Sequence, residues 1–148
     1  MRVWRLARRP HAALDGEGAR LQGGRWNSPG RPLVYSSSHL SLAALEALVH
    51  FDVDEVPEDL RAFAIEIPDA LAQEQVSPHK LPNGWTRQES ATRALGNEWL
   101  AAVRTPVLVV PSAVIPEETN VLVNPAHPAT RGVVVVTSRR FVYDPRLL

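Results

Sequence analysis

Apolar residues gather in short runs separated by turn residues, and these runs predict a chain built largely of strands. Runs rich in β-branched, aromatic and leucine residues are typical of strands when turn residues bound them. The thirteen prolines stand between the runs and favour short elements joined by rigid turns. The expected strands cover residues 3–6, 33–37, 61–67, 106–111, 120–123 and 132–137, with 139–143 as a candidate continuation of the sheet.

Two segments carry the apolar period of a helix. Residues 39–51 are apolar nearly all round, which is typical of a buried helix, and Ser38 precedes them as an expected N-cap. Residues 89–103 form the second helix. Gly96 within it costs about 1 kcal/mol relative to alanine, and it either permits close packing or marks a break. We expect a short helix or turn near residues 70–75 and a long loop over residues 7–24.

The totals narrow the class of protein. A chain of 148 residues without repeats or a clear boundary is most simply one domain. It has no cysteine, which excludes disulfides, thiolate zinc sites and cysteine nucleophiles. Sixteen basic and sixteen acidic residues cancel, which argues against direct nucleic-acid binding. No apolar run approaches the ~20 residues of a membrane span, and the first residues lack a signal-peptide pattern, so we expect a soluble, cytoplasmic protein.

Candidate chemistry is concentrated in residues 23–50, where a glycine-rich loop leads into a strand and then into the first helix. Arg25 follows two glycines, which let the backbone approach a ligand, and its guanidinium suits a phosphate. Tyr35 on the strand could stack on a planar ring. The alternatives are a solvated arginine in a turn and a tyrosine that packs at the end of the core.

Glu46 is a single carboxylate on an otherwise apolar helix, so it needs a partner. Arg25, His50 or a ligand could provide it, and a buried ion pair that only fixes packing is an equal alternative. His50 could act as a general base, but a histidine at a helix end more often caps the last carbonyls.

Ser112 follows a buried strand, where its hydroxyl or amide could hold a carboxamide. No Gly-x-Ser-x-Gly motif surrounds it, which disfavours a hydrolase nucleophile. The polar residues around the next strand, by themselves, are explained as caps and turns. The histidines lack metal-ligand spacing, so we expect no metal site. The polar residues around the strand after Ser112, which are explained as caps and turns, are Glu117, Glu118, Asn120, Asn124 and His127.

An ordered set of motifs covers nearly the whole chain and resembles the RES domain, a family named after arginine, glutamate and serine. Each motif is weak alone, but their shared order is specific. The motifs are Gly24-Arg25-Trp26-Asn27, Leu33-Val34-Tyr35-Ser36-Ser37, Leu45-Glu46-Ala47-Leu48-Val49-His50, Gly96-Asn97-Glu98-Trp99-Leu100, Val110-Pro111-Ser112 and the run of residues 115–128 that begins Ile115-Pro116-Glu117.

The resemblance implies a fold and a function. RES proteins are toxins of bacterial toxin–antitoxin pairs, and the antitoxin is typically an Xre-like helix-turn-helix protein. Their α+β fold resembles ADP-ribosyltransferase toxins, with a split, mostly antiparallel sheet flanked by helices. Members act on NAD, either degrading it by hydrolysis or phosphorolysis or transferring ADP-ribose to a protein.

Carried onto this chain, the resemblance places Arg25, Tyr35, Glu46 and Ser112 in the site, with Arg5 and Asn124 as supports. Glu46 would stabilise the cationic ribose, as carboxylates do in glycosidases. Arg25 would hold a phosphate, Tyr35 would stack on nicotinamide, and Ser112 would bind the carboxamide or ribose.

The expected function is therefore that of a toxin that cleaves the nicotinamide–ribose bond of NAD. The alternatives are ADP-ribosyl transfer to a specific protein and a non-catalytic module that only binds its partner. We also expect a homodimer or a larger assembly with the antitoxin, and an antitoxin that occludes the site.

Overall fold

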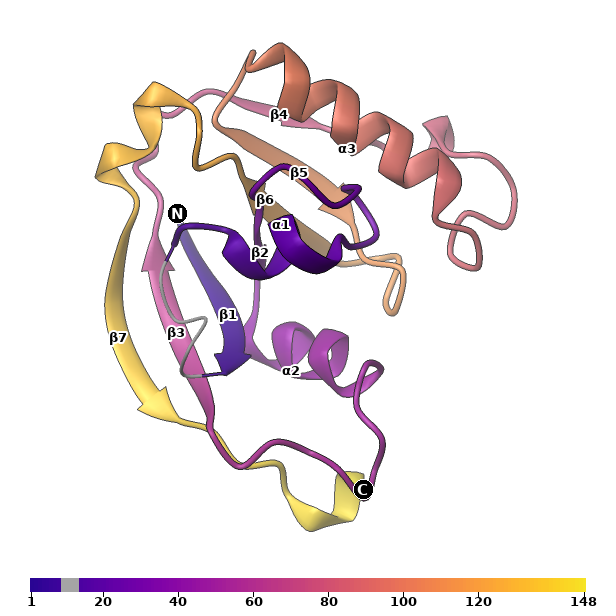
Figure 1. The fold of residues 1–148 in the computed structure, drawn as a ribbon, viewed down its shortest axis with the longest axis vertical. Helices are drawn as coiled ribbons and strands as arrows, with labels where there is room; N and C mark the ends of the chain where they lie inside the picture. The colour runs from indigo at the N-terminus through magenta and orange to yellow at the C-terminus, as the bar shows by residue number, and fades with distance from the viewer. Residues whose placement is uncertain (9–13) are drawn as a thin grey trace.

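The computed structural model describes residues 1–8 and 14–148. The described strands form one seven-stranded sheet in the order β4-β5-β6-β2-β1-β3-β7, shown in Figure 1. All neighbours are antiparallel except β4 and β5. The strands are β1 (Arg2–Arg8), β2 (Val34–Ser37), β3 (Leu60–Glu66), β4 (Gln73–Gln75), β5 (Val107–Pro111), β6 (Thr119–Val123) and β7 (Val134–Arg140).

A seam divides the sheet between β1 and β2. These two strands share a single residue pair, Trp4 with Ser37. By contrast, β1 pairs with β3 along its whole length, from Arg2 with Glu66 to Arg8 with Leu60. The sheet is therefore two ladders, β4-β5-β6-β2 and β1-β3-β7, joined by one residue pair, which agrees with the split sheet that the family resemblance implies.

Each face of the sheet carries its own core, because side chains alternate between the faces along a strand. We name them the valine-rich face and the tryptophan-rich face. The valine-rich face holds Val3, Val34, Phe63, Ile65, Ile67, Val107, Val109, Val121 and Val123. The tryptophan-rich face holds Trp26, Leu33, Leu81, Trp85, Trp99, Leu100, Leu108, Val110 and Leu122, with Tyr35 at its border.

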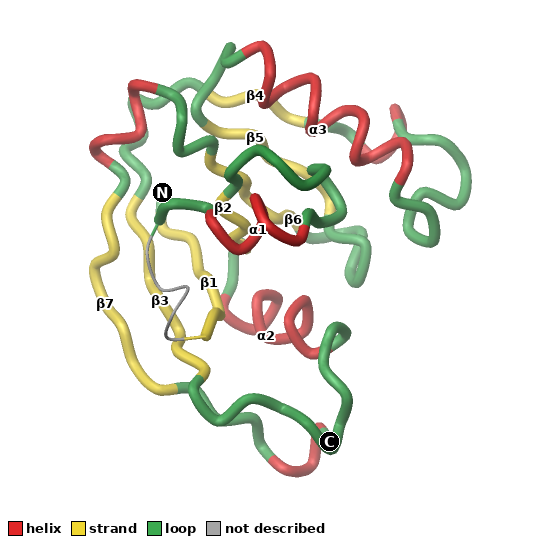
Figure 2. The backbone as a smooth tube through the Cα atoms, in the orientation of Figure 1, coloured by secondary structure: helices red, strands yellow, loops and turns green. Residues whose placement is uncertain are grey.

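Three α-helices accompany the described part of the sheet: α1 (Glu17–Gln22), α2 (Leu40–Leu48) and α3 (Ser90–Ala102). The helix α3 belongs to the tryptophan-rich face, where Trp99 and Leu100 are buried. The helix α2 packs against β1 and β2, beside the seam. Figure 2 shows the loops that lead into α3 and out of α2. Three 3₁₀ turns occur among the described residues: η2 (Pro78–Lys80), η3 (Pro128–Gly132) and η4 (Pro145–Leu147).

The helix α2 differs from its prediction in two respects. Only Leu42 and Ala43 are buried, so the helix is half covered rather than enclosed. Its N-cap is His39 and not Ser38, because the Ser38 hydroxyl bonds to Thr119 on β6 instead. The Ser38 side chain therefore connects the start of α2 to the sheet and does not cap the helix.

Two further predictions were wrong in element type. Residues 70–75 were expected to be a short helix or turn. A turn is present at residues 69–70, but Gln73–Gln75 form β4, which pairs in parallel with Val107–Val109 of β5. The segment expected as one long loop contains α1 and the end of β1, while residues 9–13 lie outside the described residues. The strands β4 and β1 pair with segments distant in the sequence, which a local pattern does not reveal.

Candidate functional site

Glu46 lies at the end of the second turn of α2 and reaches across to the neighbouring ladder. The Ser112 hydroxyl donates to Glu46 Oε1 at 2.6 Å, and Asn120 Nδ2 donates to the same oxygen at 2.7 Å. Among the described residues, none donates a hydrogen bond to Oε2. Hydrogen bonds to an ionised acceptor are short and strong, so one carboxylate oxygen is held and the other is left for a ligand.

Ser112 is fully buried directly after β5. Its hydroxyl donates to Glu46 and accepts from the backbone amides of Val114 and Ile115 at 3.1 Å and 3.0 Å. A hydroxyl has one hydrogen and two lone pairs, so all its hydrogen-bonding capacity is used. The geometry favours Ser112 as a support for Glu46, and its expected contact with substrate stays a prediction.

Arg25 lies in a tight turn closed by a bridge between Gly24 and Asn27. Its Nη1 and Nη2 donate to the carbonyls of Trp85 and Thr86, both at 3.0 Å. Two of the five N–H donors of the guanidinium are therefore occupied, which fixes its plane. The remaining donors have no partner in the described part of the chain, so the group is oriented and still able to bind an anion.

The Tyr35 hydroxyl makes two hydrogen bonds to this turn. It donates to Asn27 Oδ1 at 2.6 Å and accepts from the Trp26 amide at 3.0 Å. Burial raises the pKa of this phenol well above its ordinary value, so it stays protonated. A Cβ on Gly24 would lie 2.6 Å from the hydroxyl oxygen, so the residue before Arg25 must be glycine.

The helix α3 also contacts this turn, through Gly96, Asn97 and Thr92. A Cβ on Gly96 would lie 1.7 Å from the Trp26 carbonyl oxygen, so the missing side chain permits close packing and does not break the helix. Asn97 bonds to both the amide and the hydroxyl of Ser28, and the Thr92 hydroxyl donates to the Arg25 carbonyl. The turn is thus fixed before any ligand binds.

The expected supports, Arg5 and Asn124, do not contact Glu46. Arg5 pairs with Phe63 and so lies on the valine-rich side, and its Nη1 crosses the seam to the Tyr35 carbonyl at 3.1 Å. Burial lowers its pKa. Asn124 follows the far end of β6, where its Oδ1 accepts from the Ala126 amide. Their binding of substrate stays a prediction, and Arg5 also links the two ladders.

The site residues are connected along the tryptophan-rich face. Tyr35 and Ser37 share one side of β2, because side chains alternate along a strand. Ser37 pairs with Asn120 of β6, and Asn120 bonds to Glu46. A path therefore runs from the Arg25 turn to Tyr35, along the backbone of β2 to Ser37, and through Asn120 to Glu46. The structure gives Glu46 and Ser112 direct contact, and it links Arg25 to Tyr35 through the turn.

Sequence reasoning missed two polar residues of this path. Asn120 was interpreted as a cap or turn residue, and Ser37 was assigned no role. The alternation that places Tyr35 on one side of β2 also places Ser37 there, which was the available signal. His50 is exposed in the turn after α2, and its side chain makes no hydrogen bond to the described residues, so it does not cap the helix.

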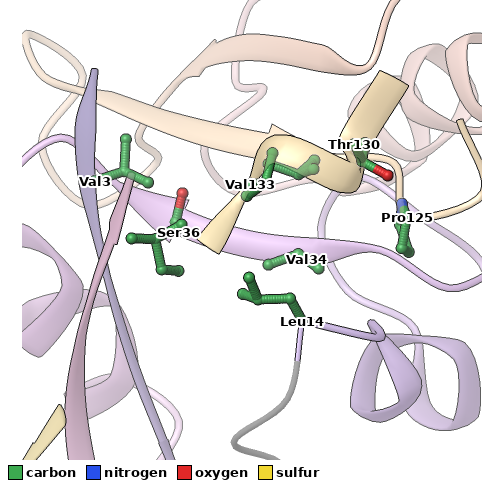
Figure 3. Close-up of a pocket in the computed structure, with 9 residues that line it drawn as sticks. Val3, Leu14, Val34, Ser36, Pro125, Thr130 and Val133 are labelled. Atoms are coloured by element: carbon green, nitrogen blue, oxygen red, sulfur yellow. The ribbon is translucent and has the colours of Figure 1, made fainter. Parts of the chain in front are cut away.

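A cavity lies on the valine-rich face and does not include Glu46 or its partners. It is lined by Val3, Leu14, Val34, Ser36, Ile65, Val123, Pro125, Thr130 and Val133, seven of which are labelled in Figure 3. Within the described ranges, no cluster of three or more potential metal-ligating side chains occurs. None of the described helices has the length and apolar character needed to cross a membrane.

The fold is shared with a solved structure. The crystal structure of the M. tuberculosis MbcT–MbcA toxin–antitoxin complex contains a chain that matches with a TM-score of 0.77 and 21% identity, over 99% of this chain and 85% of that chain. At that identity the match defines the fold. It confirms the predicted α+β class, a mostly antiparallel sheet with flanking helices.

The family follows from sequence comparison. The family model described as RES domain matches residues 2–144, and the chain belongs to that family. Similar proteins include the Prs ADP-ribosylating toxin of Sphingobium sp. (strain YBL2), 39% identical over 98% of this chain and 95% of the relative. Toxin Res of Pseudomonas putida is 38% identical, over 99% of both chains. The family predicted from the motifs is confirmed.

Proposed function

We propose that this chain is the toxin of a bacterial toxin–antitoxin pair and that it consumes NAD by cleaving the nicotinamide–ribose bond. The observation that carries the proposal is the Glu46 carboxylate, with one oxygen held by Ser112 and Asn120 and the other left for a ligand. Membership of the RES family and the names of the similar toxins support it.

The carboxylate suits the chemistry of this bond. When the bond between ribose C1′ and the pyridinium nitrogen breaks, the electron pair leaves with nicotinamide and positive charge develops on the ribose. A fixed carboxylate stabilises that charge, as in glycosidases. Water or phosphate then forms the new bond to C1′. Water gives ADP-ribose and a released proton, and phosphate gives ADP-ribose phosphorylated at C1′.

The other predicted residues have separate roles in the proposal. Arg25 binds the pyrophosphate with the donors that its carbonyl partners leave over. Tyr35 offers its ring to nicotinamide while its hydroxyl holds the Arg25 turn. Ser112 acts through Glu46, and Arg5 and Asn124 shape the strands on which the site is built.

The first experiment mixes the purified chain with NAD and measures nicotinamide release, with and without phosphate and with cell extract. Release without phosphate indicates hydrolysis, and release that requires phosphate indicates phosphorolysis. No release under any of these conditions contradicts the proposal and favours a non-catalytic module that only binds its partner.

The Glu46→Gln variant tests the carboxylate. A glutamine oxygen can still accept from Ser112 and Asn120, so the fold should survive and only the charge is lost. We expect turnover to fall by at least ~10²-fold, the order of magnitude for loss of one electrostatic group in an active site. Glu117→Gln removes an exposed carboxylate and is the matched control. Full activity of Glu46→Gln would refute the role of Glu46.

A second candidate function is ADP-ribosyl transfer to a specific protein, which the name of the Sphingobium relative favours. In this case a protein nucleophile replaces water or phosphate at C1′. NAD with a tagged adenine, added to cell extract, would then label a discrete protein band. Unlabelled extract together with rapid release of nicotinamide would instead support degradation of NAD.

The proposed partner is an Xre-like helix-turn-helix antitoxin, and the proposed assembly is a toxin dimer or larger complex with it. The structural neighbour comes from a toxin–antitoxin complex, which supports an antitoxin partner. We propose that the antitoxin covers the free side of Glu46. The complex should therefore consume NAD more slowly than the free toxin, and equal rates in the two samples would contradict this arrangement.

A further inference from the structure

We propose that Asn120 is a positioning residue, and that the relay Ser37–Asn120–Glu46 determines which oxygen of the carboxylate faces the substrate. The inference rests on the proposed NAD-cleaving function and extends it to two residues outside the predicted site. Ser37 lies on β2, Asn120 on β6 and Glu46 on α2, so the relay joins three elements.

The relay has one consistent direction. The Ser37 hydroxyl donates to Asn120 Oδ1 at 2.6 Å, and Asn120 Nδ2 donates to Glu46 Oε1 at 2.7 Å. If the amide were turned over, its oxygen would face the carboxylate, and two acceptors would oppose each other. Glu46 therefore selects the orientation of the amide, and the Ser37 hydroxyl fixes it from the other side.

Both donors of Glu46 converge on the same oxygen. Ser112 donates to Oε1 at 2.6 Å, alongside Asn120. The Ser112 hydroxyl is itself held by two backbone amides, and Asn120 is held by Ser37. The two donors approach from β5 and β6, so together they restrict rotation of the carboxylate and leave Oε2 open.

The sheet itself sets the relay in place. Ser37 and Asn120 are directly paired in the β2–β6 ladder, so their side chains leave the sheet on the same face. Asn120 is also paired with Val110, two residues before Ser112. The donors are thus fixed by strand register before substrate binds. Electrostatic stabilisation of a transition state is strongest when such groups need no reorganisation.

The experiment measures nicotinamide release at a series of NAD concentrations for Asn120→Ala, Ser37→Ala and the double variant. We expect Asn120→Ala to lower kcat by on the order of 10-fold to 100-fold, as for other residues that orient an active-site group, with KM changed less than about threefold. Ser37→Ala should have a smaller effect. In the double variant, Ser37→Ala should add almost nothing, because the residue acts only through Asn120.

A matched control removes the neighbouring hydroxyl of Thr119, which does not bond to Glu46 or Asn120. Thr119→Val breaks the contact between the hydroxyls of Thr119 and Ser38, which also joins β6 to the start of α2. It should leave kcat close to wild type. Asn120→Asp keeps the size of the side chain and replaces its donor with a carboxylate, so it should lose at least as much activity as Asn120→Ala.

Amide NMR gives a readout that does not depend on turnover. The side-chain NH₂ resonances of Asn120 should shift in Glu46→Gln and in Ser37→Ala, and stay unchanged in Thr119→Val. Three results would overturn the inference. They are a wild-type kcat in Asn120→Ala, losses of kcat that add in the double variant, and side-chain resonances of Asn120 that do not shift in Glu46→Gln. Each would leave the proposed function intact, whereas a wild-type chain that releases no nicotinamide would overturn both.

Discussion

At the scale of single residues, the hydroxyls of two residues expected to contact substrate are already hydrogen-bonded to other protein groups. The Tyr35 hydroxyl has two partners in the Arg25 turn, and the Ser112 hydroxyl has three partners around Glu46. Such groups help to position the atoms still available to a ligand, namely the remaining N–H donors of Arg25 and the Glu46 Oε2. A residue can thus affect activity without contacting NAD.

Tyr35→Phe separates the hydroxyl of this residue from its ring. The variant leaves the Trp26 amide and the Asn27 Oδ1 without the partner they share. We expect the free energy of unfolding to fall by about 1–3 kcal/mol, the cost of leaving buried polar groups unpaired. The KM for NAD should also rise, because the Arg25 turn is less fixed. Urea unfolding and the kinetics of nicotinamide release measure the two effects.

Tyr143→Phe is the matched control for the loss of one hydroxyl. The Tyr143 hydroxyl bonds only to the Ala44 carbonyl of α2 among the described residues, and it makes no hydrogen bond to the Arg25 turn. Its removal should leave the KM for NAD unchanged. If Tyr35→Phe behaved like this control, the ring alone would account for Tyr35.

At the scale of elements, α3 supports the Arg25 turn by close approach of its backbone. Gly96→Ala should therefore be destabilising, although alanine in a helix is normally favoured over glycine by about 1 kcal/mol. The new Cβ would meet the Trp26 carbonyl at 1.7 Å and displace either the helix or the turn. Thermal unfolding and NAD turnover should both decline.

The control is Ala94→Gly, two residues earlier on an exposed position of the same helix. It should cost about 1 kcal/mol of stability from helix propensity and leave turnover unchanged. A stabilising effect of Gly96→Ala would mean that α3 and the turn are not in contact in solution.

The pairing of β4 with the end of α3 depends on pH. The Arg104 guanidinium holds the pKa of Glu74 below its ordinary value of 4.5, with the Thr105 hydroxyl contributing. A lowered pKa in the folded state stabilises the fold above the ordinary value, and this contribution is lost as the pH falls below about 4.5. Both side chains are partly exposed, so the effect is modest.

Glu74→Gln should therefore flatten the loss of thermal stability as the pH falls from about 5 to about 3. Glu98→Gln removes the more exposed and more distant partner of Arg104, at 3.6 Å, and should change the pH dependence less. Melting temperatures over this pH range measure both. Equal slopes for wild type and Glu74→Gln would show that the ion pair does not form in solution.

Elements with a strong local pattern were predictable from the sequence. The apolar runs gave β1, β2, β3, β5 and β6, and the apolar period gave α2 and α3. The strand β4 was not predictable, because Gln73–Gln75 is polar and becomes a strand only beside β5. Asn120 was equally hidden, since its role depends on a contact with Glu46, 74 positions away.

At the scale of the whole molecule, the site spans the seam of the sheet. Glu46 lies on α2, which packs against β1 and β2, while its donors lie on β6 and directly after β5. The ladders β4-β5-β6-β2 and β1-β3-β7 are joined by the Trp4–Ser37 pair and by the Arg5 contact with the Tyr35 carbonyl, and side chains of both pack together in the valine-rich core. The residues of the site thus depend on how the two ladders are joined.

Hydrogen exchange should reveal this division. Amides in the interior of β3 and β6 are each paired within their own ladder, and we expect them to exchange as two groups with different opening free energies. Arg5→Met removes the guanidinium that crosses the seam and keeps much of the apolar stem. It should speed exchange at the Tyr35 and Ser37 amides more than at β3. Uniform exchange across both ladders would indicate a single cooperative unit.

The single residue pair between β1 and β2 also affects the order in which the protein loses activity and secondary structure on heating. If the ladders separate before either one melts, α2 can shift relative to β5 and β6 while most backbone hydrogen bonds persist. Glu46 would then lose its donors in a molecule that still has its secondary structure. Activity should accordingly disappear at a lower temperature than the circular dichroism signal, and it should return on cooling for as long as the ladders remain intact.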